Sequence, residues 1–145
     1  MNLSYQEKSI WGSLLALLVV FGSYFVSVDW LREPEAPDTK LDRIVGAVAL
    51  VVLIEIVYHV LIALKSRAEP KDERDVLIAG RAYRNAYLLL TAGSFISIAL
   101  FLGLTEAQRS GGQPMAAVDL LLAFVIAAEI TKFVTQLIYY RWRLS

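Results

Sequence analysis

The run Ile44–Leu64, IVGAVALVVLIEIVYHVLIAL, decides the fold of this chain. As an α-helix its 21 residues would extend about 31 Å, close to the hydrocarbon thickness of a bilayer. Two titratable side chains, Glu55 and His59, lie four residues apart inside it and therefore share one helical face. A carboxyl group near the middle of a membrane span is costly unless it has a partner, water or a proton. We therefore expect a membrane-spanning helix with one polar face.

Three more apolar runs have membrane-spanning length, and we place them at about residues 10–28, 86–104 and 115–140. Hydrophobic residues make up 57% of the 145 residues, above the roughly 45–50% of a typical soluble domain. The first run is long for a signal peptide and no A-x-A-like cleavage site follows it, so we expect it to be retained. The sequence thus predicts a single domain over residues 1–145, an all-α integral membrane protein with four transmembrane helices in an antiparallel bundle.

The segment between the second and third spans, residues 65–84, sets the expected orientation. It carries six of the 14 Lys and Arg residues, and loops rich in these residues stay on the cytoplasmic side. With four spans, both termini are then cytoplasmic. We expect a multi-pass protein of the cell (inner or plasma) membrane with an N-in, C-in topology.

Two connecting features carry further expectations. Residues 29–43 are acidic, and we expect a solvated loop whose centre Pro34 and Pro37 keep from forming a helix, with Asp42 as the cap of the second span. Gly12 and Ala16 in the first span form a small-xxx-small pair, the spacing that lets helices approach closely in lipid.

The charged residues of the second and fourth spans fall at matching depths. Glu55 lies almost at the bilayer centre, with His59 about 7 Å closer to the cytoplasm. The fourth span runs the opposite way and repeats this order, with Glu129 near the centre and Lys132 about 6–7 Å closer to the cytoplasm. We therefore predict one intramembrane polar cluster made of Glu55, His59, Glu129 and Lys132.

Three interpretations of this cluster remain open. It is either a structural ion-pair network that stabilises the bundle, a path for protons or cations, or a metal or catalytic site. The third is the weakest, because Lys132 would repel a cation and E-x-x-x-H lacks the second histidine of H-E-x-x-H. No nucleophile stands beside a base, so we name no catalytic residue, no metal site and no cofactor.

Composition excludes several classes of function. The chain has no cysteine, which excludes disulfides and thiolate chemistry. Its 14 basic and 14 acidic residues cancel, so no basic field indicates nucleic acid as a partner. The expected partners are membrane lipid, a cytoplasmic or membrane protein, and further copies of this chain, since four spans make a narrow scaffold.

The segment Pro70–Tyr87, PKDERDVLIAGRAYRNAY, resembles the central cytoplasmic loop of an uncharacterised family of small four-span prokaryotic membrane proteins that carry a D-E-R segment there. The match is carried by Asp72, Glu73, Arg74, Arg81 and Arg84. The resemblance implies the same four-span layout and no activity, because the family has none assigned.

The arginines of that segment, Arg74, Arg81 and Arg84, are candidates for binding anionic lipid or a partner, or they only fix the topology. We expect a non-enzymatic structural or regulatory subunit that oligomerises and contacts a partner or anionic lipid through residues 65–84. The alternative is a proton- or cation-linked transporter or channel that uses the intramembrane cluster. An intramembrane enzyme acting on a lipid is the weakest hypothesis.

Overall fold

The computed structural model describes residues 4–27, 37–65, 72–108 and 115–142. These ranges hold four helices: α1 (Tyr5–Ser27), α2 (Pro37–Lys65), α3 (Glu73–Gln108) and α4 (Met115–Trp142). Each helix contains a segment that is long and apolar enough to cross a membrane. The prediction of an all-α chain with four membrane-spanning candidates is therefore confirmed, and the chain has the make-up of a multi-pass membrane protein.

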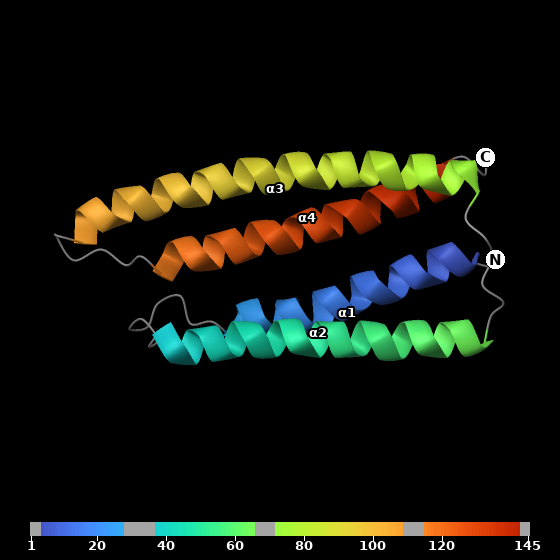
Figure 1. Ribbon diagram of the computed structural model, residues 1–145, viewed down its shortest axis with the longest axis horizontal. Helices are drawn as coiled ribbons and strands as arrows, with labels where there is room; N and C mark the ends of the chain where they lie inside the picture. Colours follow the sequence, from blue (N-terminus) through green and yellow to red (C-terminus); the bar gives the residue numbers. More distant parts are fainter. Residues whose placement is uncertain (1–3, 28–36, 66–71, 109–114, 143–145) are drawn as a thin grey trace.

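Consecutive helices run antiparallel (Figure 1). Tyr5, Lys65, Glu73 and Trp142 therefore lie at one end of the molecule, which we call the terminus end, and the other four helix boundaries lie at the far end. Helix α1 packs against both α2 and α4, and α4 packs against α3. The described helices thus form a row in the order α2, α1, α4, α3, with α2 and α3 at its two sides (Figure 1).

Reciprocal side-chain hydrogen bonds begin two of the helices. At α1 the Glu7 amide donates to Ser4 Oγ (3.2 Å), and the Ser4 amide donates to Glu7 Oε2 (3.0 Å). At α3 the Asp75 amide donates to Asp72 Oδ1 (2.7 Å), and the Asp72 amide donates to Asp75 Oδ2 (3.2 Å). These pairs satisfy amides that have no partner inside a helix, and the acidic side chains also suit the positive end of the helix dipole.

Helix α2 begins earlier than we expected from the sequence. Pro37 is its first residue, so the part of the expected loop from Pro37 to Arg43 is helical and Asp42 lies inside the helix instead of capping it. The physical reason is that proline suits the first position of a helix, where its missing N–H would have no partner in any case. Residues 29–36 lie outside the described residues.

The apolar core lies between α1, α2 and α4. Its buried side chains come from the second half of α1, the first half of α2 and the middle of α4: Leu17, Val20, Phe21, Tyr24, Ala47, Val51 and Ile126. Elsewhere α2 is largely uncovered, with 6% of its apolar segment buried inside the chain. Most of this helix is therefore not covered by the other described helices.

Two glycines allow close helix contacts. A Cβ atom on Gly12 would lie 1.8 Å from Cε1 of Tyr58, so the ring of a residue on α2 occupies the space that this glycine leaves on α1. The Tyr58 hydroxyl donates to the Lys8 carbonyl (2.6 Å) and fixes the ring there. On α3, a Cβ atom on Gly93 would lie 2.2 Å from Cγ of Phe124 on α4.

Candidate functional site

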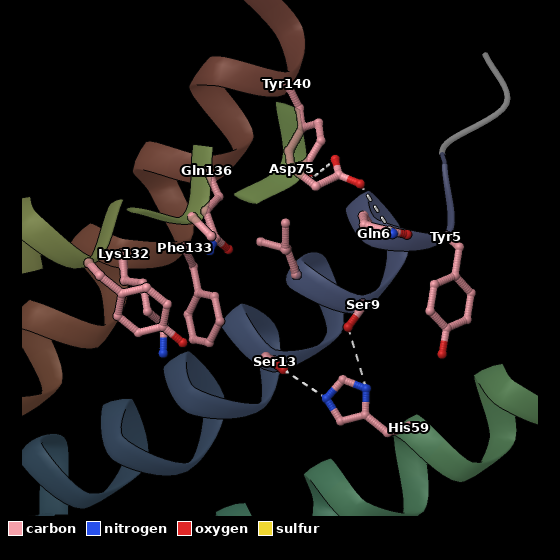
Figure 2. A pocket seen from close by; sticks show the side chains of 13 residues that line it. Tyr5, Gln6, Ser9, Ser13, His59, Asp75, Lys132, Phe133, Gln136 and Tyr140 are labelled. Atoms are coloured by element: carbon pink, nitrogen blue, oxygen red, sulfur yellow. Dashed lines mark hydrogen bonds between the residues drawn. The ribbon is translucent and has the colours of Figure 1, made fainter. Parts of the chain in front are cut away.

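A polar cavity of about 300 Å³ lies at the terminus end, and all four helices contribute to its lining (Figure 2). The volume is at the lower limit of sites that bind small molecules. Hydroxyl, imidazole, carboxylate, ammonium and amide groups face it, from Ser9, Ser13, His59, Asp75, Lys132 and Gln136. The four helices that line the cavity are all candidate membrane spans, so the cavity gathers polar side chains inside a bundle that is otherwise mostly apolar.

His59 is held on both sides of its ring. Ser9 Oγ lies 3.4 Å from Nδ1, and Ser13 Oγ lies 3.4 Å from Nε2 (Figure 2). A neutral imidazole has one nitrogen that donates and one that accepts, and each nitrogen faces one hydroxyl. Because the two serines are four residues apart on one face of α1, the pair fixes the orientation of a side chain that projects from α2.

Lys132 combines an ion pair with two aromatic contacts. Its Nζ donates to Glu129 Oε2, three residues earlier on α4. The same ammonium lies 4.4 Å from the ring centroid of Phe133 and 5.5 Å from that of Tyr83, which comes from α3. The Lys132 side chain is 13% exposed while that of Glu129 is 42% exposed, so the carboxylate is the outer member of the pair. Because both members of the ion pair lie on α4, the pair does not link one helix to another.

Asp75 links three helices at the mouth of the cavity. The Tyr140 hydroxyl on α4 donates to its Oδ1 (2.6 Å), and Gln6 Nε2 on α1 donates to its Oδ2 (3.5 Å) (Figure 2). Asp75 also accepts from the Asp72 amide at the start of α3. Both carboxylate oxygens are thus occupied. The sequence predicts a helix that begins at Asp72–Asp75 after Pro70, with acidic residues in its first turn, but it contains no sign of the contact with Tyr140.

The structure places the predicted cluster residues unequally. His59 and Lys132 line the same cavity, and Glu129 contacts it through Lys132. Glu55 is partly exposed on α2 and is not among the residues that line the cavity. Two of the four residues therefore line this cavity, a third is paired with one of them, and the histidine forms hydrogen bonds with serines of α1.

The three arginines of the predicted lipid- or partner-binding set all lie near the start of α3. Arg81 and Arg84 are exposed, and the Arg81 guanidinium lies 5.3 Å from the ring centroid of Tyr139. Arg74 is partly buried, and its Nε and Nη2 atoms have no hydrogen-bond partner in the structure as described.

Sequence analysis missed a buried ion pair at the far end. Lys40 Nζ on α2 lies 2.5 Å from Asp119 Oδ2 on α4, and the two residues are 8% and 4% exposed. The pair joins two helices that have no extensive contact of their own. We had placed Lys40 in a solvated loop, and the earlier start of α2 is what brings it inside.

Within residues 4–27, 37–65, 72–108 and 115–142, no group of three or more His, Asp or Glu side chains is arranged to hold a metal ion. No protein-family model, curated protein or solved structure matches the chain. The resemblance carried by Pro70–Tyr87 therefore stays a prediction.

Proposed function

We propose that the protein is a non-enzymatic structural or regulatory subunit of the cell membrane, with both termini in the cytoplasm, that contacts anionic lipid or a partner protein at its terminus end. The observation that carries this proposal is the exposure of Arg81 and Arg84 in the first third of α3. A basic side chain near an anionic membrane surface contributes about 1 kcal/mol to lipid binding. Lys8, Lys65 and Arg141 are also exposed at this end and add to the positive charge.

The proposal includes oligomerisation. Helix α2 presents large apolar side chains along its length, and almost none of its apolar segment is buried within the chain. In a membrane this surface is compatible with lipid or with a neighbouring subunit, and α2 at the side of the row is free to contact either.

The alternative function is a proton- or cation-linked transporter or channel. Glu129 favours it, because its side chain is 42% exposed near the middle of the α4 span. The apolar core argues against a transport function. In this core Leu17, Val20 and Phe21 pack with residues of α2 and α4, between the cavity and the far end of the molecule. A path through one chain would have to cross this packed layer.

The test of the main proposal reverses the charge of the α3 arginines. Purified wild type and Arg81→Glu/Arg84→Glu are compared by native mass spectrometry after exchange into detergent with a fixed amount of phosphatidylglycerol. We expect the double variant to retain less anionic lipid, because the loss of two contributions of about 1 kcal/mol each weakens binding by at least about thirtyfold. Lys8→Glu, on α1 at the same end, is the matched control and should have a smaller effect. Equal retention by all three proteins would remove the basis of the proposal.

A further inference from the structure

The cavity at the terminus end holds more hydrogen-bond donors than the described chain uses. An ammonium group has three N–H donors, and Lys132 directs one of them to Glu129. Gln136, one turn further along α4, lines the same side of the cavity and brings an amide group with two donors. Across from them, Ser9 and Ser13 present hydroxyls that can turn from His59 towards a ligand (Figure 2).

The negative charges near the cavity are already engaged. Asp75 lines the cavity, and both of its oxygens accept hydrogen bonds, from Tyr140, Gln6 and the helix start. Glu129 does not line the cavity and faces outward from the ion pair. The charged residues of the lining are thus Asp75, whose oxygens already accept hydrogen bonds, and Lys132. Lys132 and the neutral donors beside it are the groups left to meet a ligand, an arrangement suited to an anionic group with several acceptor oxygens.

Access to the cavity is available from the side. Its lining includes residues of α2 and α3, which have no extensive contact with each other among the described helices. It also lies towards the ends of all four candidate spans, at the level where the helices approach the headgroup layer. A headgroup could therefore enter from the membrane, and a small solute could enter from the water at the same end.

We propose that this cavity binds a phosphate group, carried either by a membrane phospholipid or by a small soluble phosphate ester. Lys132 supplies the charge-assisted contact, and Ser9, Ser13 and Gln136 donate hydrogen bonds to the remaining oxygens. A phosphate monoester carries between one and two negative charges near pH 7, and the Lys132 ammonium supplies a charge-assisted partner for one of its oxygens. Where the source is a lipid, this inference rests on the proposed lipid contact at the terminus end, but it uses residues other than Arg81 and Arg84.

The experiment measures binding to the full-length protein in detergent by isothermal titration calorimetry. The probes are dihexanoyl phosphatidic acid, glycerol 3-phosphate and dihexanoylglycerol, which lacks the phosphate. We expect saturable binding of at least one phosphate-bearing probe and none of dihexanoylglycerol. Binding of phosphatidic acid alone identifies a lipid as the source, and equal binding of both phosphate probes identifies the phosphate ester itself.

Variants then test the assigned residues. Lys132→Met should weaken phosphate binding by about tenfold or more, the size typical of a lost charge-assisted hydrogen bond, while Lys132→Arg should keep most of it. Ser23→Ala removes a hydroxyl of α1 that lies outside the cavity and donates to the Val20 carbonyl, and it should bind like the wild type. Because Lys132→Met leaves Glu129 without its partner, Ser13→Ala serves as a second variant that keeps the ion pair, and its affinity should also fall.

Two outcomes would overturn the inference: no binding of either phosphate probe, or unchanged affinity in both Lys132→Met and Ser13→Ala. The same variants distinguish a failure of this inference from a failure of the proposed function. If Arg81→Glu/Arg84→Glu binds phosphatidic acid normally while Lys132→Met does not, the surface contact is wrong and the cavity site stands. The reverse result leaves the surface contact and removes the cavity site.

Discussion

At the scale of single residues, the contact of Gly93 with Phe124 leaves no room for a methyl group. A Cβ atom at position 93 would lie 2.5 Å from Cβ of Phe124 and 2.2 Å from its Cγ, and these atoms cannot move away unless α3 and α4 separate. We therefore expect Gly93→Ala to lower the free energy of unfolding by about 1–3 kcal/mol, the usual cost of overpacking. Thermal unfolding in detergent measures the change.

Gly80 provides the matched control, because it lies in the same helix and a Cβ atom there would meet nothing within 4 Å. Gly80→Ala should be neutral or gain up to about 1 kcal/mol from the higher helix propensity of alanine. If both variants melted at the same temperature, the close contact of α3 with α4 at position 93 would be wrong. Gly12→Ala should also be destabilised, because its Cβ atom would lie 1.8 Å from Cε1 of the Tyr58 ring, which a hydrogen bond to the Lys8 carbonyl holds in place.

The buried pair of Lys40 and Asp119 gives a second prediction at this scale. Removing one member of a buried ion pair typically costs about 3–5 kcal/mol, and Lys40→Met takes this cation away from the buried Asp119 carboxylate. We expect Lys40→Met and Asp119→Leu each to be strongly destabilised, and the double variant to recover most of the lost stability. The readout is the melting temperature in detergent of the two single variants and the double variant. Additive losses in the double variant would show that the two side chains do not interact.

Individual contacts were predictable from the sequence only where both partners lie on one helix. The spacing of Glu129 and Lys132 places them on one face, and the structure pairs them. The partners of His59 could not be found in this way, because hydropathy does not fix how each helix is rotated about its axis. Two serines of α1 lie beside the imidazole nitrogens of His59, and the predicted cluster did not include them.

At the scale of elements, the start of α3 shows how far local signals reach. The sequence indicated a helix beginning at Asp72–Asp75 after Pro70, and α3 begins at Glu73. The start of α2 was misplaced because Pro37 was interpreted as a helix breaker, whereas it is the first residue of the helix. Acidic residues in the first turn of a helix therefore help to locate its start. Proline does not, because it can either end a helix or occupy its first position.

The two aspartates at the start of α3 should differ in their effect on stability. Asp72→Ala removes the side chain that accepts from the Asp75 amide, and such a change typically costs about 1 kcal/mol. Asp75→Ala also removes the acceptor of the Tyr140 hydroxyl and the contact with Gln6, so its cost should be larger by about 1–3 kcal/mol. Melting temperatures of the two variants provide the comparison, and Tyr140→Phe tests the extra term by itself. Equal losses in Asp72→Ala and Asp75→Ala would mean that the link to α4 contributes nothing.

At the scale of the whole molecule, the sequence predicted the number of spans but not their order in space. Four apolar runs were recognisable because length and composition are enough to identify a span, and all four correspond to helices. That α1 lies between α2 and α4 depends on side-chain packing, such as the fit of Tyr58 against Gly12, which hydropathy does not record. The polar cavity follows from this packing, so its full lining could not have been assembled from the sequence.

The orientation of the chain in the membrane gives the last prediction. The helices place Lys65 and Arg141 at the terminus end and Asp42 at the far end, all three exposed. The chain has no cysteine of its own, so single variants can be labelled without background. If the basic end is cytoplasmic, a membrane-impermeant maleimide should label Asp42→Cys in intact cells but label Lys65→Cys and Arg141→Cys only after permeabilisation. The reverse pattern would invert the topology, and labelling of Lys65→Cys and Arg141→Cys from opposite sides would contradict the four-span layout itself, because α3 and α4 together must return the chain to the side where α2 ends.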